Sequence, residues 1–341
     1  LGVALYLLFG HNYARREQIQ YSQEALREVD DIIASQIRNS DKMLFADKRF
    51  IKVAHMNLVN DHMRVTSNNK VRIFNNGADK FASLKQDIRE AGEDGHLLYF
   101  ISRTDELGRG IIDLLTEKAE QGVDVKVVYD DIGNFAVSSL AFHKLRKAGG
   151  SVHRYSPIIT SLFTANYRNH RKITVVDGRV GYVGGMNIGD EYLGHHKKLH
   201  PWRDTHLRLI GHSVWFLQER FLMDWGYANE SEQDERLKVE KFFPPCEAKG
   251  KLGVQIVSGG PDTTESPLKS GLLSQIYSAR KNVFLQTPYF APDASIMDAL
   301  RVAAQSEVDV RLMLPSLNDH LLSQMSTLGS AYQPLRSGGR A

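Results

Sequence analysis

The chain has 341 residues, which is enough for about two domains. Hydrophobic residues make up 42% and charged residues 24%, as in globular proteins, which excludes wholesale disorder and collagen-like repeats. Lys and Arg total 43 against 40 Asp and Glu, so the balance gives no extended track for nucleic acid, and the single cysteine, Cys246, excludes a disulfide framework and a cysteine-cluster zinc site.

The chain opens on nine apolar residues, LGVALYLLF, which end at Gly10 and are followed by Arg15 and Arg16. At about 1.5 Å per residue this run covers less than half of a bilayer core. We expect residues 1–16 to be the truncated end of a membrane anchor. An amphipathic start that docks on the protein and a clipped signal sequence are the alternatives.

Residues 17–39 carry spaced apolar positions that predict a juxtamembrane helix. The rest of the segment up to residue 78 is expected to be a linker that holds one short strand over 70–74. A turn follows at Asn75-Asn76-Gly77.

An internal repeat organises the remainder of the chain. Each copy predicts a strand, a helix and a strand: 96–100, 108–121 and 123–129 in the first, and 283–285, 294–305 and 308–314 in the second. Such a unit is βαβ, which pairs its strands in parallel under a helix. We therefore expect an α/β fold of two repeated βαβ-containing domains, with mixed, mainly parallel sheets covered by helices.

The first copy alone continues into the segment HRKITVVDGRVGYVGGMN, which runs from His170 to Asn187. Its pattern predicts a strand over 170–176, a primed turn at Asp177-Gly178 and a returning strand over 179–183. Residues i and i+2 of a strand share a face, so His170 and Lys172 project together while Arg171 points the other way. The Gly184-Gly185 pair allows close backbone approach.

A histidine beside a lysine suits a phosphodiester. The ammonium group neutralises phosphoryl oxygens, and the imidazole can attack phosphorus or transfer a proton. Asn187 can donate a hydrogen bond to the developing charge. A lone histidine on a strand would more simply be a satisfied structural residue, but His170 belongs to a larger constellation.

The constellation matches His-x-Lys-x4-Asp-x6-Gly-Gly-x-Asn, the signature of the phospholipase D superfamily. Three flanking segments resemble bacterial cardiolipin synthases within it: 169–194, the Pro-Trp-Arg-Asp-Thr-His run over 201–206, and Thr-Pro-Tyr-Phe over 287–290. The resemblance implies two motifs that meet at one site without metal or other cofactor. One histidine takes the phosphatidyl group as a phosphohistidine, the other protonates the leaving alcohol, and a second phosphatidylglycerol accepts the group, which gives cardiolipin and glycerol.

The resemblance also assigns roles to residues. His170 would be the nucleophile, although the two histidines could exchange roles, while Lys172 and Asn187 would bind phosphoryl oxygens. Asp177 belongs to the catalytic motif, but its place in the turn predicts that it holds the hairpin. Asp204 is a candidate to fix the His170 tautomer, and a surface salt bridge with Arg203 or Arg208 is the alternative.

The chain departs from the family pattern because it holds no second His-x-Lys-x4-Asp. His320 has no lysine two residues later. We therefore expect the second domain to stop before its motif and the chain as written to be inactive. Two alternatives stay open: a single-motif phosphodiesterase or nuclease that builds its site across a homodimer, and a non-catalytic fragment that binds phospholipid headgroups.

The expected organisation has four parts: the anchor end over 1–16, the juxtamembrane helix and linker over 17–78, a first phospholipase D-like domain over 79–241 and a truncated second one over 242–341. The partners implied are phosphatidylglycerol, other phospholipids and a membrane, with no nucleic acid and an open oligomeric state. The resemblance places the protein at the bacterial inner membrane, with its catalytic part on the cytoplasmic side.

Four further segments have expected roles. The basic and aromatic loop 195–202 is either solvated or membrane-facing, and residues 158–163 either pack in the core or accommodate acyl chains. Residues 216–225 are expected to form a core-facing helix, and Phe242–Pro245 the inter-domain linker.

Overall fold

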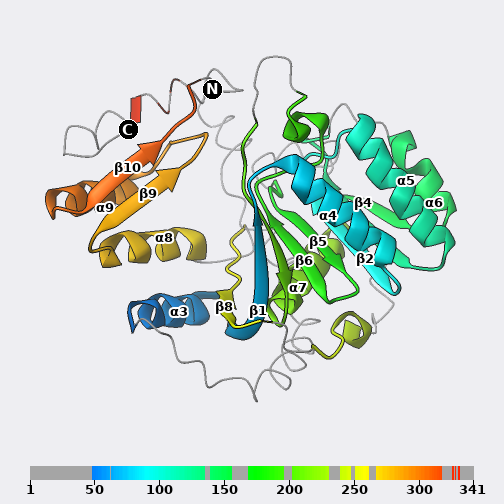
Figure 1. The fold of residues 1–341 in the computed structure, drawn as a ribbon, viewed down its shortest axis with the longest axis horizontal. Helices are drawn as coiled ribbons and strands as arrows, with labels where there is room; N and C mark the ends of the chain where they lie inside the picture. The colour runs from blue at the N-terminus through cyan, green and yellow to red at the C-terminus, as the bar shows by residue number, and fades with distance from the viewer. Residues whose placement is uncertain are drawn as a thin grey trace, which may run out of the picture. The chain divides into compact units, whose positions relative to one another are not determined.

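A computed structural model describes residues 48–61, 63–134, 139–155, 168–195, 202–229, 239–246, 250–260 and 266–316, together with 325, 327, 329 and 330. The predictions for 1–16, 17–39, 158–163, most of the 195–202 loop, His320 and the last residues lie outside these ranges. The described chain divides into two compact units (Figure 1). The first holds residues 64–256 and 260, and the second holds 48–63, 257–259 and the residues from 266 onward.

The first unit is built on an eight-stranded sheet in the order β4-β3-β2-β5-β6-β7-β1-β8. Its strands are β1 Val65–Phe74, β2 Asp94–Tyr99, β3 Asp124–Asp130, β4 Ser151–Tyr155, β5 Lys172–Val176, β6 Val180–Gly184, β7 His206–Ile210 and β8 Leu252–Gln255. Parallel pairing joins β2, β3 and β4, and every other neighbouring pair is antiparallel. The predicted α/β class with mixed sheets is confirmed, and parallel pairing in this sheet is confined to the strands that helical connections join.

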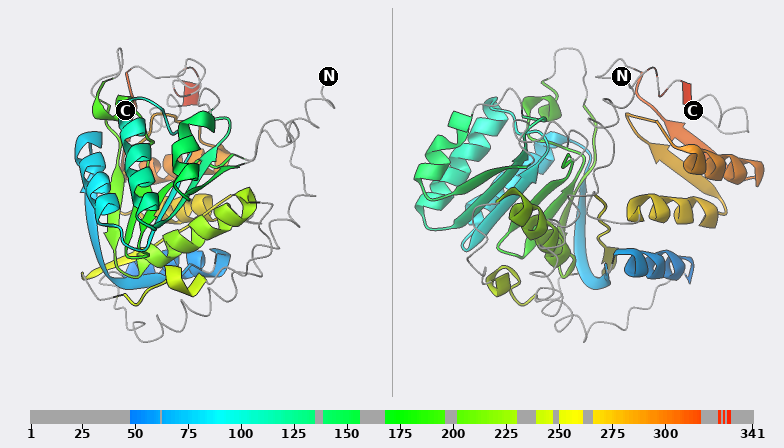
Figure 2. Two further views of the ribbon diagram at one scale, coloured as in Figure 1. Left: turned by 90° about the vertical axis from the view of Figure 1, so that its right-hand side faces the viewer. Right: turned by 180° about the vertical axis from the view of Figure 1, so that it is seen from behind.

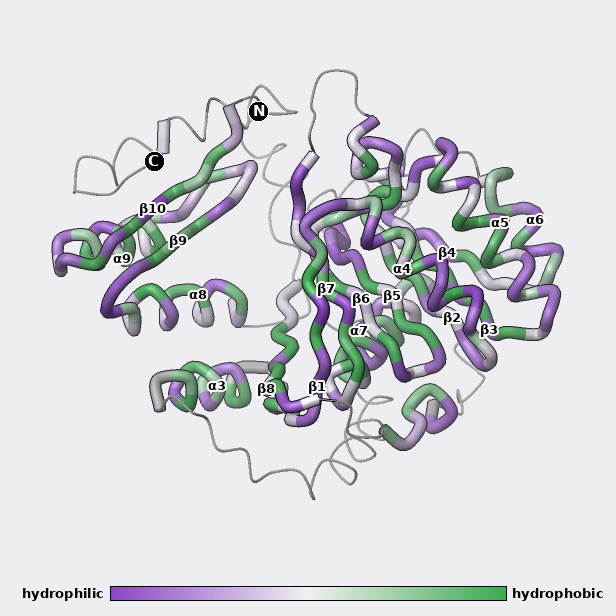
Figure 3. Tube along the Cα trace, in the orientation of Figure 1, coloured by the Kyte–Doolittle hydropathy of each residue, from purple (hydrophilic) through white to green (hydrophobic). Residues whose placement is uncertain are grey.

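Helices cover both faces of this sheet (Figures 1 and 2). One face carries α4 Gly77–Glu90, α5 Glu106–Glu120 and α6 His143–Lys147, and the other carries α7 Ser213–Ala228. Short 3-10 turns lie at Ser139–Phe142 (η2), Asp190–Leu193 (η5) and Val239–Phe242 (η6). Apolar and polar residues alternate around the turns of α4 and α5 (Figure 3), as in helices with one buried face.

Side-chain caps explain where α4 and α5 begin. Asn76 accepts from the N–H of Asp79 at the start of α4, and Asp105 accepts from the N–H of Gly108 at the start of α5. A side-chain cap of this kind stabilises a helix by about 1 kcal/mol. The helix predicted over 216–225 is confirmed as part of α7, whose Phe221 and Trp225 are buried.

The predicted turn between β5 and β6 is also confirmed. Asp177 and Gly178 adopt φ of 52° and 58°, as a type I′ turn requires. Strand β5 begins at Lys172 and not at His170, because the N–H groups of Asn169 and Arg171 donate to side chains and do not pair in the ladder.

Two segments expected as linkers are packed elements. Residues 48–78 form α3 Lys48–Asp61, all of β1 and the start of α4, because β1 pairs with β7 and β8 far along the chain. Phe242 and Phe243 are buried in the first unit, where Phe242 contacts the ring of His96 edge-on at 4.7 Å. The chain passes into the second unit after Ile256.

The second unit contains the predicted second βαβ repeat. It comprises α3, α8 Pro267–Ser278, β9 Asn282–Gln286, α9 Ala294–Gln305 and β10 Asp309–Met313. β9 and β10 pair in parallel, which confirms the predicted strand–helix–strand unit. Its core consists of Ile276, Phe290, Leu300, Val310 and their neighbours.

Among the described residues, no helix is both long enough and apolar enough to cross a membrane.

Candidate active site

His170 and Lys172 meet on one aromatic ring. The His170 ring lies 4.7 Å from the ring of Phe100, at 57°, and the Lys172 ammonium lies 5.4 Å from the same ring. Phe100 directly follows β2, whose Tyr99 is the ladder partner of Lys172. The side chains of His170 and Lys172 therefore lie together at the carboxyl end of β2.

The site favours a neutral imidazole. Burial, and then the charge of Lys172, lower the pKa of His170, while its side chain stays exposed enough to meet a ligand. Burial lowers the pKa of Lys172 to about 8, and Asp204 acts in the opposite direction. The Lys172 ammonium donates to the carbonyl oxygen of His170 at 2.6 Å. A neutral ring beside an ammonium group is the arrangement that nucleophilic attack on an anionic phosphodiester needs.

The glycine pair after β6 admits the segment that carries Asp204. A Cβ at Gly185 would lie 2.1 Å from Asp204 Oδ1, and one at Gly184 would lie 2.5 Å from the His206 Cα. Only glycine leaves this room. Burial raises the pKa of Asp204, against the Thr205 N–H and the charges of Lys172 and Arg203.

Arg208, one of the two arginines expected as ion-pair partners of Asp204, pairs with another carboxylate. Arg208 forms a two-pronged pair with Asp87 of α4, with both contacts at 2.7 Å, and does not serve Asp204. Asp204 Oδ1 accepts from the Thr205 N–H at 2.6 Å, and the described residues show no hydrogen bond between Asp204 and His170. The orienting role of Asp204 stays a prediction.

Asn187 is buried and its amide is engaged at both ends. Oδ1 accepts from the Ile101 N–H at 3.1 Å, and Nδ2 donates to the Tyr192 hydroxyl at 2.9 Å. Burial raises the pKa of Tyr192 to about 12, which keeps this phenol neutral. Asn187 thus joins the end of β2 to η5, and its predicted phosphate contact would use the second N–H of the amide.

Asp177 lies at the opposite end of the motif strand. Seven residues at about 3.3 Å each place it roughly 23 Å along the chain from His170. Its Oδ1 accepts from the N–H groups of Glu93 and Asp94 at 2.8 and 2.9 Å, and its Oδ2 from that of Gly92 at 3.0 Å. The structure therefore separates Asp177 from the two residues with which the motif groups it, and gives it contacts that hold the hairpin to β2.

A row of buried polar residues that sequence reasoning missed lies behind Lys172. His206 is fully buried with no partner on either ring nitrogen in the described structure, and burial, then Lys80 and Lys172, lower its pKa. Lys80 of α4 is also fully buried and donates to the Tyr99 hydroxyl at 3.1 Å. The only available signal was the position of His206 at the end of the 201–206 run.

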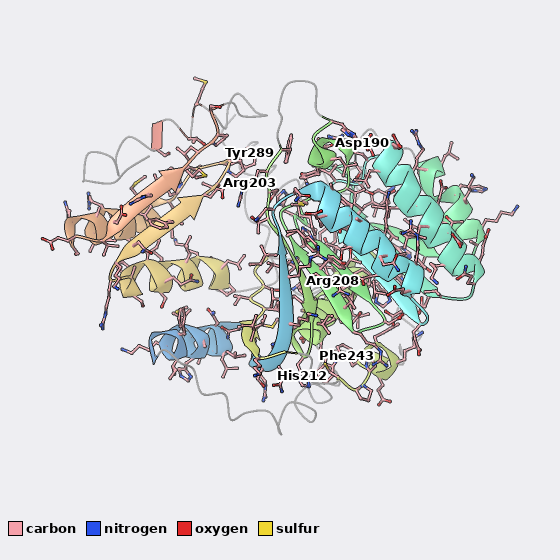
Figure 4. The ribbon with its side chains drawn as sticks, in the orientation of Figure 1. Asp190, Arg203, Arg208, His212, Phe243 and Tyr289 are labelled. Carbon is pink, nitrogen blue, oxygen red and sulfur yellow. The ribbon has the colours of Figure 1, made fainter. Side chains whose placement is uncertain are left out.

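Labelled side chains mark the two ends of the first unit (Figure 4). Asp190 and Arg203 lie at the end that carries the site, His212 and Phe243 lie toward the opposite end, and Arg208 lies between. Within the described ranges no three His, Cys, Asp or Glu residues are grouped so as to hold a metal. The expectation of a metal-free and cofactor-free site stays a prediction.

Known proteins resemble this chain over nearly its whole length. The family model described as "Cardiolipin synthase, PLD-like domain" matches residues 84–198 and 272–340. The major cardiolipin synthase ClsA of Bacillus subtilis (strain 168) is 40% identical over 348 residues, which cover 99% of this chain and 71% of that protein. Cardiolipin synthase of Staphylococcus aureus (strain N315) is 39% identical, covering 99% and 69%.

Among solved structures, phosphatidylserine synthase of Haemophilus influenzae Rd KW20 shares the fold, with a TM-score of 0.54 and 14% identity over 77% of this chain and 66% of that one. The mixed sheet and the motif strand thus define a phospholipase D-like α/β enzyme. The chain belongs to the cardiolipin synthase family of phosphatidyltransferases.

Proposed function

We propose that this protein takes part in cardiolipin synthesis by transferring a phosphatidyl group through a phosphohistidine at His170. The observation that carries the proposal is the pairing of His170 and Lys172 on the Phe100 ring. The relatives named above are cardiolipin synthases, which makes phosphatidylglycerol the phosphatidyl donor to test first.

The first half-reaction forms one bond and breaks one. A ring nitrogen of neutral His170 attacks phosphorus, and the P–O bond to the glycerol headgroup breaks. Lys172 balances charge on the phosphoryl oxygens, and Asn187 donates its remaining N–H to one of them. The glycerol oxygen must gain a proton as it leaves, which the resemblance assigns to the histidine of a second motif.

The second half-reaction completes the transfer. The terminal hydroxyl of another phosphatidylglycerol attacks phosphorus and gives its proton to the same second-motif histidine. The P–N bond to His170 breaks, and cardiolipin is released. Asp204 holds the His170 tautomer during both steps. The sequence given contains one such motif, which supplies the proposed nucleophile and not the acid for the leaving glycerol.

A substrate with a good leaving group tests the nucleophile without the acid. Phosphatidyl-p-nitrophenol releases p-nitrophenolate, which needs no protonation at neutral pH. We expect a burst of about one p-nitrophenolate per chain, with lipid phosphorus attached to His170. The Asp204→Asn form should react more slowly, and His170→Asn should give no burst. A burst of equal size from His170→Asn would sink the proposal.

Location in a bacterial membrane, with the catalytic part on the cytoplasmic side, belongs to the same proposal. It is supported by the apolar run over 1–9 and the arginines that follow it. Protease treatment of intact spheroplasts should leave the chain uncut, whereas treatment of inverted vesicles should digest it. Digestion in intact spheroplasts would place it on the other side.

A further inference from the structure

His170 lies outside the regular ladder. Pairing between β2 and β5 begins at Tyr99 and Lys172, so the backbone of residues 169–171 depends on side-chain contacts. The N–H of Asn169 donates to Asp130 Oδ2 at 3.1 Å, and the N–H of Arg171 donates to Asn169 Oδ1 at 3.0 Å. The backbone N–H groups of both neighbours of His170 therefore donate to side-chain oxygens and not to the backbone of an adjacent strand.

The Arg171 side chain makes a further contact, with a helix. It points to the opposite face of the sheet, where Nη1 lies 3.4 and 3.3 Å from the two carboxylate oxygens of Asp224 on α7. The Asp224 side chain is 1% exposed and also receives Arg220, one turn away on the same helix, at 2.5 Å. Although burial alone would raise it, the charges of Arg171 and Arg220 keep the pKa of Asp224 below its ordinary value.

The two arginines have different structural consequences. Arg220 and Asp224 lie four residues apart on α7, so the ion pair between them is internal to that helix. Arg171 connects that helix to the residue directly after His170. Arg220 balances part of the Asp224 charge from within α7, whereas the contact with Arg171 attaches the start of the motif strand to this helix.

We infer that Arg171 and Asp224 are positioning residues that hold the His170 peptide against α7, so that its ring stays on Phe100 and faces phosphorus. The inference rests on the proposed function for its kinetic consequence. The contact between Arg171 and Asp224 lies on the α7 face of the sheet, and neither residue touches the reacting atoms. Misplacement of a reacting group by about 1 Å can cost roughly 100-fold in rate.

Two matched variants separate positioning from charge balance. Arg171→Gln and Arg220→Gln each remove one cation from Asp224 and leave the other. We expect Arg171→Gln to lower the burst rate constant with phosphatidyl-p-nitrophenol by about tenfold or more, with the burst amplitude unchanged. Arg220→Gln should change the rate by less than about threefold, and Arg171→Lys, which keeps the charge but loses the planar fork, should lie between wild type and Arg171→Gln.

A second measurement does not depend on activity. The His170 ring lies 4.7 Å from the Phe100 ring, so the NMR shifts of its carbon-bound protons report whether the two rings stay in contact. Arg171→Gln should move them toward unpacked values, and Arg220→Gln should leave them unchanged. Absence of a wild-type burst would defeat the proposed function and leave this measurement standing.

Equal effects of Arg171→Gln and Arg220→Gln on rate and shifts would overturn the inference, because charge balance alone predicts them. Should Arg171→Gln fail to fold by its melting curve, Asp224→Asn, which keeps the shape of that side chain, carries the test. A wild-type rate and wild-type shifts in Asp224→Asn would then reject positioning.

Discussion

Asp177 and Asp94 are joined by two reciprocal hydrogen bonds. The N–H of Asp94 donates to Asp177 Oδ1 at 2.9 Å, and the N–H of Asp177 donates to the carbonyl oxygen of Asp94 at 3.0 Å. The motif thus combines two structural positions. His170 and Lys172 lie at the candidate site, and Asp177 attaches the far end of the hairpin to β2.

Substitution of Asp177 should therefore change stability more than chemistry. Asp177→Ala leaves three N–H groups without an acceptor and places alanine at positive φ, so it should lower the free energy of unfolding by about 2 kcal/mol. Asp177→Asn keeps one acceptor oxygen and tolerates this φ, and should lower it by about half as much. Urea unfolding measures both. A large loss of burst rate in a fully folded Asp177→Ala would instead make Asp177 part of the chemistry.

Asp94 should make stability fall as pH rises. Burial, then the charges of Asp177 and Asp124, raise its pKa to about 7, against Lys126 and Lys241. The folded state therefore holds a proton that the unfolded state releases near pH 4, and the associated stability is lost as pH rises through about 7. Asp94→Asn should lack this loss, and its advantage over wild type should grow by about 2–4 kcal/mol between pH 4 and pH 8.

Urea midpoints at pH 5 and pH 8 measure the difference, with Asp113→Asn on the exposed side of α5 as the control. A constant difference between Asp94→Asn and wild type at the two pH values would show that Asp94 does not carry the buried proton.

Lys80 should weaken the fold at neutral pH. Burial holds its pKa well below the ordinary 10.5, so the unfolded state binds a proton that the folded state lacks, and wild-type stability rises with pH toward that value. Lys80→Met keeps the volume without the penalty. Its free energy of unfolding should exceed that of wild type by about 1 kcal/mol or more at pH 7, with a smaller gain near pH 10.

The Phe81 ring offers a competing account, because the Lys80 ammonium lies 3.7 Å from its centroid. If that ring keeps Lys80 charged, Lys80→Met will be less stable than wild type, and the difference in stability between the two will not change between pH 7 and pH 10. Thermal melts across this pH range distinguish the two accounts.

Gly185→Ala should disturb the site through Asp204. The new Cβ would lie 2.1 Å from Asp204 Oδ1, so the carboxylate must move away. Asp204 is the group that raises the pKa of Lys172 against burial, and its displacement should let that pKa fall below about 8. Binding of the nitrophenyl ester at pH 8 should weaken by about three- to tenfold.

The matched control for this change is Gly95→Ala in β2, whose Cβ would meet nothing within 4 Å. The concentration dependence of the burst gives the affinity of each form. Unchanged affinity in Gly185→Ala would mean that Asp204 does not act on Lys172.

The sequence predicted those parts of the fold that local patterns specify. The two βαβ repeats, the Asp177-Gly178 turn and the buried face of α7 each follow from spacing within one segment. The place of β1 could not be predicted in this way. Its contacts join residues far apart, such as the Thr66 hydroxyl and the Val254 carbonyl at 3.0 Å, and no pattern in a single sequence records them.

The candidate site likewise has a part that local patterns predicted and a part that they did not. Alternation along a strand predicted that His170 and Lys172 share a face, and their common contact with Phe100 agrees with it. The carboxylate of Asp224 and the buried Lys80 come from helices whose own sequences carry no sign of the motif. Only tertiary packing brings these groups to the strand.

The I′ turn has a consequence for the order of folding. The hairpin of β5 and β6 closes over a two-residue connection, which places it among the fast local events. Phe100 and Asp224 lie 70 and 54 residues from His170 along the chain, so the contacts that complete the site must wait for slower, long-range closure. The motif strand is thus made early as a scaffold and becomes a catalytic surface late, and turn variants should delay refolding while leaving the assembled site as it is.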